Sequence, residues 1–323
     1  MIRLLTIVAA AGFWAALANA AEPLAVSYFP GPSMGPLFAG IENGAFAKEG
    51  LAITAESTSG SVAQITAMLD GKYQIAFSGL DDAIAYDVGE GEVPIAGSAD
   101  LIAIMGTDSG ALHLVGAPEV KRVEDLRGRT VAVDAKNTGF AFVLYHVAAL
   151  HGLEPGAYSV LSVGSSQKRL EALTQGKAQG AVMFKPVADL LAARGFNDLL
   201  AVSDVLPHYQ AAAVLARRGW AASHRRAVVA FIRTYVAQAR WFLDPANKEA
   251  ATRILMRSMN LSQPAAAAGL AASPNPGGSI GRIDAAGVAA AVTLRETYAL
   301  PKKALGSPRK FYDLSYYRAA VGR

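Results

Sequence analysis

The chain contains no cysteine among its 323 residues, which excludes several kinds of chemistry. It has no disulfide bond, no thiolate metal ligand, no cysteine nucleophile and no N-terminal cysteine that could carry a lipid. Its five histidines form no H-E-x-x-H pair, and no G-x-x-x-x-G-K-[ST] phosphate loop occurs. We therefore expect no metal site and no cofactor, and any use of ATP would belong to a partner.

Long runs of like charge and long apolar runs are also missing from most of the chain. Only 17% of the residues are charged, and the basic ones are spread without interleaved aromatic residues. A nucleic-acid-binding protein is disfavoured, because it would show a basic stripe. Past residue 20, no apolar run reaches the roughly 20 residues that span a bilayer. We expect at most peripheral contact with a membrane complex.

The first 20 residues have the pattern of a secretory signal peptide. Arg3 supplies the basic start, residues 4–17 are almost all apolar, and Ala18 and Ala20 form a small-residue cleavage site. We expect cleavage after Ala20, which leaves 303 residues (323 minus 20) with a net charge of +3 (29 basic minus 26 acidic). The mature chain should be a soluble protein outside the cytoplasm, most simply in a bacterial periplasm.

The mature chain opens with a strand, a loop, a helix and a second strand. Residues 25–29 form an apolar and aromatic run, and the sequence PGPSMGP at 30–36 breaks it. Apolar residues at helical spacing follow, and Pro36 suits a first helical turn because its missing N–H would be unpaired there. A loop between a strand and a helix can hold a ligand.

A repeat indicates two similar halves. The sequence GKYQIA at 71–76 returns as GKAQGA at 176–181, 105 positions later. Each copy lies between an apolar helix, opened by a Gly-Ser pair, and an apolar strand. The ordered match of these features predicts two similar α/β lobes.

The alternation of strands and helices predicts an α/β fold with two mainly parallel sheets, each flanked by helices. We expect strands at 24–29, 51–56, 74–78, 130–134, 158–163, 180–184 and 199–202. From Trp220 onward the pattern is helical, with Ser223 as a possible N-cap. We expect the chain to pass between the lobes twice, near 108–116 and near 205–213. The first lobe would then consist of residues 21–108 plus 209–323, and the second of residues 109–208. A surface loop is expected at 273–278.

Ligands of such sheets bind beyond the carboxyl ends of the strands, where loops lead into helix N-termini. That rule selects six loops, at 30–36, 59–61, 78–82, 135–140, 164–166 and 184–186. Helix N-termini stabilise an anion by about 0.3 to 1 kcal/mol each at exposed sites. Several of them converging on one cleft could hold a carboxylate or sulfonate without catalysis.

Five segments, in order, carry a family resemblance: PLFAGIENGAFAKEGLAI, SGSVAQITAMLDGKYQIAFSG, VEDLRGRTVAVDAKNTG, LTQGKAQGAVMFKPVAD and a late YDLSYY. Together they span nearly all of the mature chain. The chain resembles periplasmic substrate-binding proteins of ABC importers, in the nitrate, sulfonate, taurine and pyrimidine-precursor branch. The resemblance implies a type II periplasmic binding protein fold, a monomer that closes on a small-molecule solute and docks on a permease with its ATPase.

By position, the resemblance implies ten ligand contacts: Ser33, Met34, Ser61, Gly79, Asp81, Asn137, Thr138, Gly139, Phe140 and Lys185. Several have a structural alternative: Ser61, Asn137 and Thr138 are also suited to helix capping and turns. Met34, Phe140 and Phe184 are as suited to a core as to an apolar pocket wall.

The charge of the solute stays open. A sulfonate- or carboxylate-type anion is favoured, and Lys185 could pair with it. Asp81 would repel an anion unless it points away or caps its helix, so a ligand with an amine or a heteroaromatic N–H, such as a pyrimidine or thiamine precursor, is the alternative.

Two other classes compete with a solute receptor. Residues 31–35, GPSMG, match G-x-S-x-G between a strand and a helix, so Ser33 is a candidate hydrolase nucleophile. A hydrolase sheet normally supplies several strands before that point, however, and no catalytic residue is predicted. The last alternative is a scaffold relative that has kept the fold and lost transport. Such a protein would carry no ligand when purified from its own periplasm.

Overall fold

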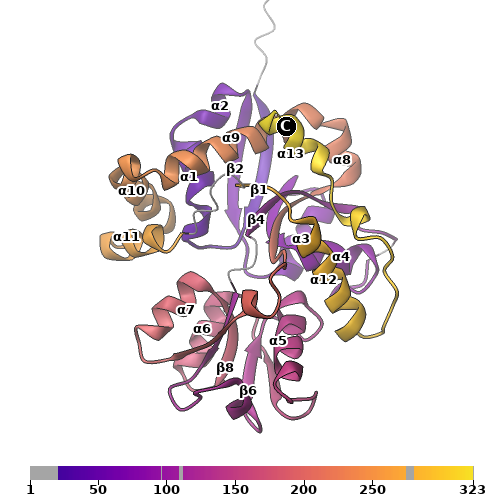
Figure 1. Ribbon diagram of the computed structural model, residues 1–323. Coiled ribbons are helices and arrows are strands. Elements are labelled where there is room, and N and C mark those ends of the chain that lie inside the picture. Colours follow the sequence, from indigo (N-terminus) through magenta and orange to yellow (C-terminus); the bar gives the residue numbers. More distant parts are fainter. Residues whose placement is uncertain (1–20, 96, 109–111, 274–279, 323) are drawn as a thin grey trace, which may run out of the picture.

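The computed structural model describes residues 21–95, 97–108, 112–273 and 280–322. These residues form two α/β lobes, each built on a five-stranded mixed sheet (Figure 1). The sheet of lobe 1 has the order β2-β1-β3-β10-β4. Its strands are β1 (Glu22–Tyr28), β2 (Leu51–Ser57), β3 (Ile75–Gly79), β4 (Leu101–Asp108) and β10 (Ala212–Arg217). The first three run parallel, and β10 is antiparallel to both of its neighbours.

The sheet of lobe 2 repeats this plan, with the order β7-β6-β8-β5-β9. Its strands are β5 (Leu112–Gly116), β6 (Thr130–Val133), β7 (Ser159–Ser162), β8 (Gly180–Phe184) and β9 (Asn197–Ala201). Strand β6 pairs in parallel with β7 and β8, and β5 is antiparallel to β8 and β9. The two-lobed α/β fold expected from the sequence is confirmed.

Helices flank both sheets. The α-helices are α1 (Gly35–Glu42), α2 (Ala45–Lys48), α3 (Ser61–Leu69), α4 (Leu80–Asp87), α5 (Gly139–Leu150), α6 (Ser166–Thr174), α7 (Lys185–Ala192), α8 (Arg218–Ser223), α9 (Arg225–Leu243), α10 (Lys248–Met259), α11 (Gln263–Ala271), α12 (Ala285–Tyr298) and α13 (Leu314–Val321). Short 3-10 helices are η1 (Pro32–Met34), η2 (Val123–Leu126), η3 (Val202–Asp204), η4 (Pro245–Asn247) and η6 (Pro308–Phe311). Within the described residues, no helix is long and apolar enough to cross a membrane.

The sequence repeat corresponds to a structural one. Helix α3, strand β3 and helix α4 return 105 positions later as α6, β8 and α7. The glutamine just before the repeated strand ties that strand to the parallel strand beside it, β1 in lobe 1 and β6 in lobe 2. The Gln74 side chain accepts a hydrogen bond from the backbone N–H of Ala25 at 2.9 Å, and Gln179 accepts one from Thr130 at 3.2 Å. This shared contact explains why both copies keep glutamine there.

The seven strands expected from the sequence all occur, within about two residues. Strands β4, β5 and β10 are missing from the sequence prediction: β5 and β10 overlap the expected crossings, and no strand is predicted at 101–108. Both β5 and β10 run antiparallel beside parallel strands, so they lie outside the alternating strand and helix pattern. The expected N-cap at Ser223 is wrong: Ser223 ends α8, where its hydroxyl donates to the backbone, and His224 precedes α9. The expected loop at 273–278 lies almost wholly outside the described residues.

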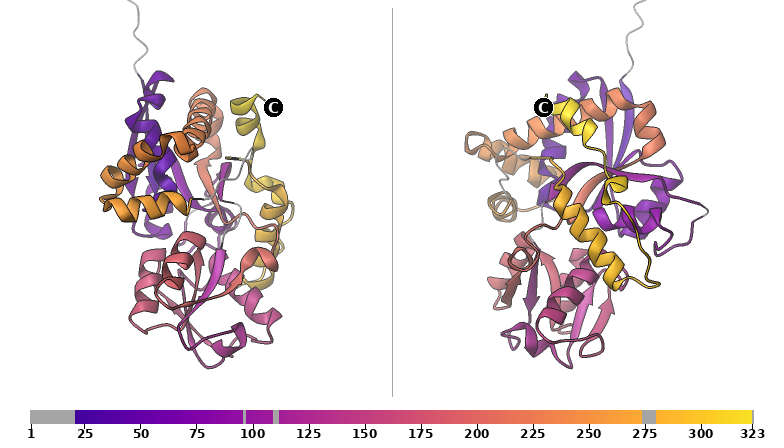
Figure 2. Two further views of the ribbon diagram at one scale, coloured as in Figure 1. Left: turned by 60° about the vertical axis from the view of Figure 1, so that its left-hand side comes forward. Right: turned by 45° about the vertical axis from the view of Figure 1, so that its right-hand side comes forward.

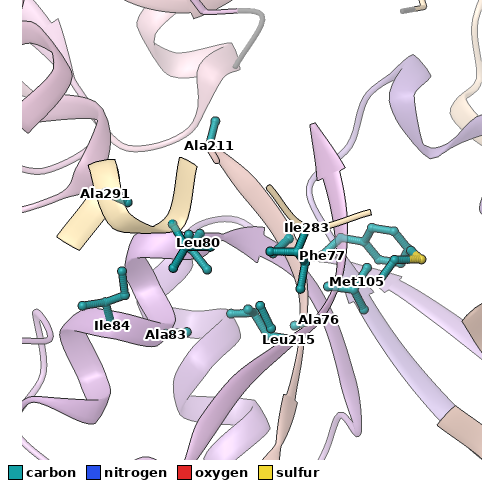
Figure 3. Packing of buried hydrophobic residues seen from close by; sticks show 14 of the residues in the cluster. Ala76, Phe77, Leu80, Ala83, Ile84, Met105, Ala211, Leu215, Ile283 and Ala291 are labelled. Atoms are coloured by element: carbon teal, nitrogen blue, oxygen red, sulfur yellow. The ribbon is translucent and has the colours of Figure 1, made fainter. Parts of the chain in front are cut away.

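The C-terminal helices cover lobe 1 and reach lobe 2. Helix α9 packs on α1 and α13, and its Phe231 stacks on Phe46 with ring centroids 5.3 Å apart. Helix α12 contacts α4 of lobe 1 and α5 of lobe 2, so it runs along the side of both lobes (Figure 2). Beneath the junction of the lobes, Leu80 and Ile84 on α4 pack near Ala291 of α12 and against the sheet (Figure 3).

Candidate ligand-binding site

A small cavity lies at the junction of the two lobes. Its volume is about 20 Å³, which is room for about one water-sized group. Three segments line it: the end of β3 with the start of α4, the end of β6 with the start of α5, and the chain just before β10. The lining residues are Gly79, Asp81, Asp82, Asp134, Thr138, Gly139, Phe140, Tyr209 and Ala211.

Local hydrogen bonds hold these segments in place. The backbone N–H of Leu80, the first residue of α4, donates to the carbonyl of Ala211 at 3.1 Å. Thr138 is the N-cap of α5, where its hydroxyl accepts from Ala141 N and donates to Asp134 at 2.7 Å. Both helices therefore begin at the cavity, as expected for loops at the carboxyl ends of parallel strands.

The two lobes meet closely at Gly139. A methyl group on its Cα would lie 2.7 Å from Cβ of Asp81 and 2.7 Å from the hydroxyl oxygen of Tyr209. Such distances are well below ordinary van der Waals contact. Glycine is therefore required at this position for the two lobes to meet as they do.

Asp81 lies at the cavity wall, but its charge is neutralised by Arg295 of α12. The two side chains form a bidentate pair, with Nε to Oδ1 at 2.7 Å and Nη2 to Oδ2 at 2.5 Å. Arg295 is 1% exposed, and it also donates to Glu90 at 2.9 Å and to the carbonyl of Asn137 at 3.0 Å. Its guanidinium lies 4.9 Å from the ring centroid of Phe142 in lobe 2. Arg295 thus links α4 to lobe 2.

Asp82 and Asp134 approach the cavity from opposite lobes. Ser78 donates to Asp82 at 2.7 Å, just as Thr138 donates to Asp134. Burial raises the pKa of Asp82 to about 7, against the opposing effect of the Ser78 hydrogen bond. Burial also raises the pKa of Asp134, although the nearby charge of Arg169 and the Thr138 hydrogen bond lower it. Each carboxyl is therefore easier to protonate than an ordinary aspartate.

The raised pKa of Asp82 predicts a pH-dependent stability. Between its ordinary value of 3.8 and about 7, the native state binds more protons at Asp82 than the unfolded state does. The free energy of unfolding should therefore fall as the pH rises through this range, by up to about 1.4 kcal/mol per pH unit from this group. Urea denaturation at about pH 5 and pH 7.5 should show a smaller fall for Asp82→Asn than for the wild type. Equal falls in the two proteins would contradict the assignment.

Phe140 of the cavity wall packs against a second aromatic residue, Phe184. The rings of Phe140 and Phe184 meet edge to face, with centroids 5.6 Å apart. The guanidinium of Arg169 lies 5.3 Å from the Phe140 ring, and Arg169 is 2% exposed. Its hydrogen bonds go to the carbonyls of Gly164 and Val182 and to the Ser166 hydroxyl. Arg169 is not among the cavity-lining residues.

Half of the ten residues expected to contact the ligand line the cavity: Gly79, Asp81, Thr138, Gly139 and Phe140. The other five are not among its lining residues. Met34 is buried in the core of lobe 1, and Ser61 is the first residue of α3, whose N-cap is Gly60. The side chain of Asn137 accepts from the backbone of Leu300 at 3.1 Å.

Lys185 and Ser33 also lie outside the cavity lining. Lys185 pairs with Asp189 on the exposed side of α7 at 2.7 Å. Ser33 is exposed on η1, between β1 and α1. Within the described residues, no histidine or carboxylate forms a hydrogen bond with Ser33, so the arrangement of a hydrolase nucleophile is not present there.

Asp134, Tyr209 and Ala211 lie outside the loops selected from the sequence, and Asp82 lies in the selected loop 78–82 but is not among the ten expected contacts. Asp134 is the last residue of the strand predicted at 130–134, whereas β6 ends at Val133, so Asp134 belongs to the strand-end loop that was predicted to begin at residue 135. Tyr209 and Ala211 lie in a segment without periodicity, where the sequence offers no signal. No group of three or more histidine, aspartate or glutamate side chains suited to a metal ion occurs among the described residues.

Residues 33–267 match the family model described as ABC transporter, phosphonate, periplasmic substrate-binding protein. The chain belongs to this family. It is thus a periplasmic substrate-binding protein of the ABC-importer type, as the resemblance of its sequence implied. No curated protein sequence matches it.

Solved structures of other substrate-binding proteins share the fold of this one. The nitrate-binding protein NrtA of Synechocystis PCC 6803 has a TM-score of 0.75 and 13% identity, covering 93% of this chain and 88% of its own. The alkanesulfonate-binding protein SsuA of Xanthomonas axonopodis pv. citri, bound to MOPS, has a TM-score of 0.70 and 15% identity, covering 91% of this chain and 99% of its own. A zinc-bound ligand-binding component of an ABC-type import system from Staphylococcus aureus has a TM-score of 0.75 and 14% identity, covering 94% of this chain and 100% of its own. At these identities the likeness extends to the fold alone.

Proposed function

We propose that this binding protein captures a small polar solute in the cavity between its lobes and delivers it to an ABC permease. The observation that carries this proposal is the composition of the cavity wall. Asp82 comes from lobe 1, Thr138 and Gly139 come from lobe 2, and Tyr209 comes from the segment between them. A solute held there touches both lobes and the connecting segment at once.

Contact with both lobes converts binding into a change of shape. A solute that interacts with both walls binds the closed arrangement more tightly than an open one, and it shifts the population toward the closed state by that difference in affinity. The permease would then recognise the closed surface, and its ATPase would drive uptake from the far side of the membrane. The protein itself would act without catalysis.

The proposal includes the form of the mature protein. Cleavage after Ala20 would release a monomer of residues 21–323 into the periplasm. Residues 21–108 plus 209–323 would form the first lobe and residues 109–208 the second, so that the chain crosses between the lobes twice. A site beside these crossings is well placed for hinge closure.

Native mass spectrometry of the protein purified from the periplasm of its host tests this function. We expect the mass of the mature chain plus one small molecule, and we expect the added mass to disappear after unfolding and refolding. A chain that carries nothing under gentle conditions would favour a scaffold protein that has lost transport, and it would contradict the proposal.

A further inference from the structure

We propose that the cavity selects its solute by a cationic nitrogen group, of the ammonium type, held between the carboxyl groups of Asp82 and Asp134. This inference rests on the proposed function, because it names the chemistry that the same cavity takes. It reverses the preference for an anion that the sequence alone favoured.

The charges around the cavity support a cation. The lining contains three aspartates and no lysine, arginine or histidine. Asp81 is already neutralised by Arg295, which leaves Asp82 and Asp134 facing the space. Each of these two carboxyls accepts one side-chain hydrogen bond, whereas a carboxylate offers about four acceptor positions. Both have acceptor capacity left for an N–H donor.

The two buried arginines near the cavity do not provide an anion site. Within the described residues, the hydrogen bonds of Arg295 go to Asp81, Glu90 and the Asn137 carbonyl. The hydrogen bonds of Arg169 go to two carbonyls and a hydroxyl within lobe 2, and its charge acts on Asp134. An anion entering the cavity would therefore meet two carboxyl groups before it met a positive side chain.

Tyr209 is a second, independent indication of a ligand. Its side chain lines the cavity, it is only 3% exposed, and its hydroxyl has no hydrogen-bond partner among the described residues. The hydroxyl lies beside Gly139, where the lobes meet. The Tyr209 oxygen can accept a further hydrogen bond from an N–H donor held between Asp82 and Asp134.

The size of the cavity agrees with its charge. A space of about 20 Å³ holds about one water-sized group, and an ammonium group is of that size. A sulfonate or phosphonate head has a central atom and three oxygens, so it would require the walls to separate. An ammonium group also offers three donors, which matches the three acceptors Asp82, Asp134 and Tyr209.

Three probes with the same two-carbon chain test the inference: ethylammonium, ethanesulfonate and taurine, which carries both groups. Isothermal titration of the full mature protein should be made at about pH 8, where Asp82 is ionised, with EDTA present to remove metal ions. We expect ethylammonium and taurine to bind at least about tenfold more tightly than ethanesulfonate. Asp82→Asn and Asp134→Asn should each weaken taurine binding by about tenfold or more.

Asp189→Asn is the matched control, because it removes an exposed aspartate of lobe 2 that pairs with Lys185 away from the cavity. It should leave taurine binding unchanged. The wild-type comparison of the three probes needs no variant, so the test holds even if a substitution prevents folding. Ethanesulfonate binding as tightly as taurine, binding that EDTA abolishes, or no binding of any probe would overturn the inference. If the inference fails in one of these ways, a small molecule retained by the protein in native mass spectrometry would still support the proposed function.

Discussion

Replacing Arg295 with methionine is expected to lower the free energy of unfolding by about 3 to 5 kcal/mol. The side chain is fully buried, and the substitution leaves the buried Asp81 without a cation and leaves the buried Glu90 only its 3.8 Å pair with Lys303. Removing one partner of a buried ion pair is costly because the remaining charge stays desolvated. Methionine keeps much of the volume, so the loss reports charge more than packing. Urea denaturation at neutral pH measures it.

The control for this variant is Arg253→Met on α10. Arg253 also pairs with a glutamate, Glu249, but both side chains are exposed and 3.7 Å apart. An exposed pair contributes about 0 to 1 kcal/mol, so this variant should stay close to the wild type. Adding Asp81→Asn to Arg295→Met should restore part of the lost stability, because it removes one of the unpaired charges. A loss for Arg295→Met no larger than that for Arg253→Met would contradict the assignment of a buried ionic centre.

Gly139→Val is expected to keep the lobes apart. Its Cβ would stand 2.7 Å from Asp81 and from Tyr209, on the opposite side of the junction. The lobes can relieve this overlap by opening, which removes the solute's contact with one wall. The variant should fold, should lose about tenfold or more in affinity for its solute, and should retain less of it in native mass spectrometry.

Gly60→Ala is a matched control for Gly139→Val. Gly60 also stands just before a helix in a loop expected to face the cleft, but a Cβ there would have nothing within 4 Å. Its backbone is extended, with φ of 178°, so alanine is tolerated. This variant should bind like the wild type. A Gly139→Val protein that binds its solute with unchanged affinity would show that the contact at Gly139 is not part of closure.

The sequence indicated the fold more fully than the site. Strands followed by helices have a clear apolar periodicity, and the repeat carried the prediction from one lobe to the other. Strands such as β5 and β10, each inserted antiparallel after the chain changes lobes, carry no such signal. Their places depend on pairing with strands that are distant in the sequence.

Site residues that are neighbours in the sequence could be predicted, whereas contacts between residues far apart in the sequence could not. Thr138, Gly139 and Phe140 could be predicted because a strand end and a helix start lie beside each other in the sequence. Asp81 and Arg295 are 214 positions apart in the sequence. Whether the Asp81 carboxylate is neutralised could therefore not be predicted before the fold was known. Neighbouring helix residues point in different directions, and that difference lets Asp81 meet Arg295 while Asp82 faces Ser78.

Small-angle X-ray scattering tests the central claim, that solute binding between the lobes closes the protein. The radius of gyration should be compared for protein purified with its periplasmic solute and for the same protein after unfolding, dialysis and refolding. We expect the solute-loaded protein to be the more compact, and Gly139→Val to show no such difference. Equal radii for the loaded and emptied wild-type protein would contradict closure as the mechanism.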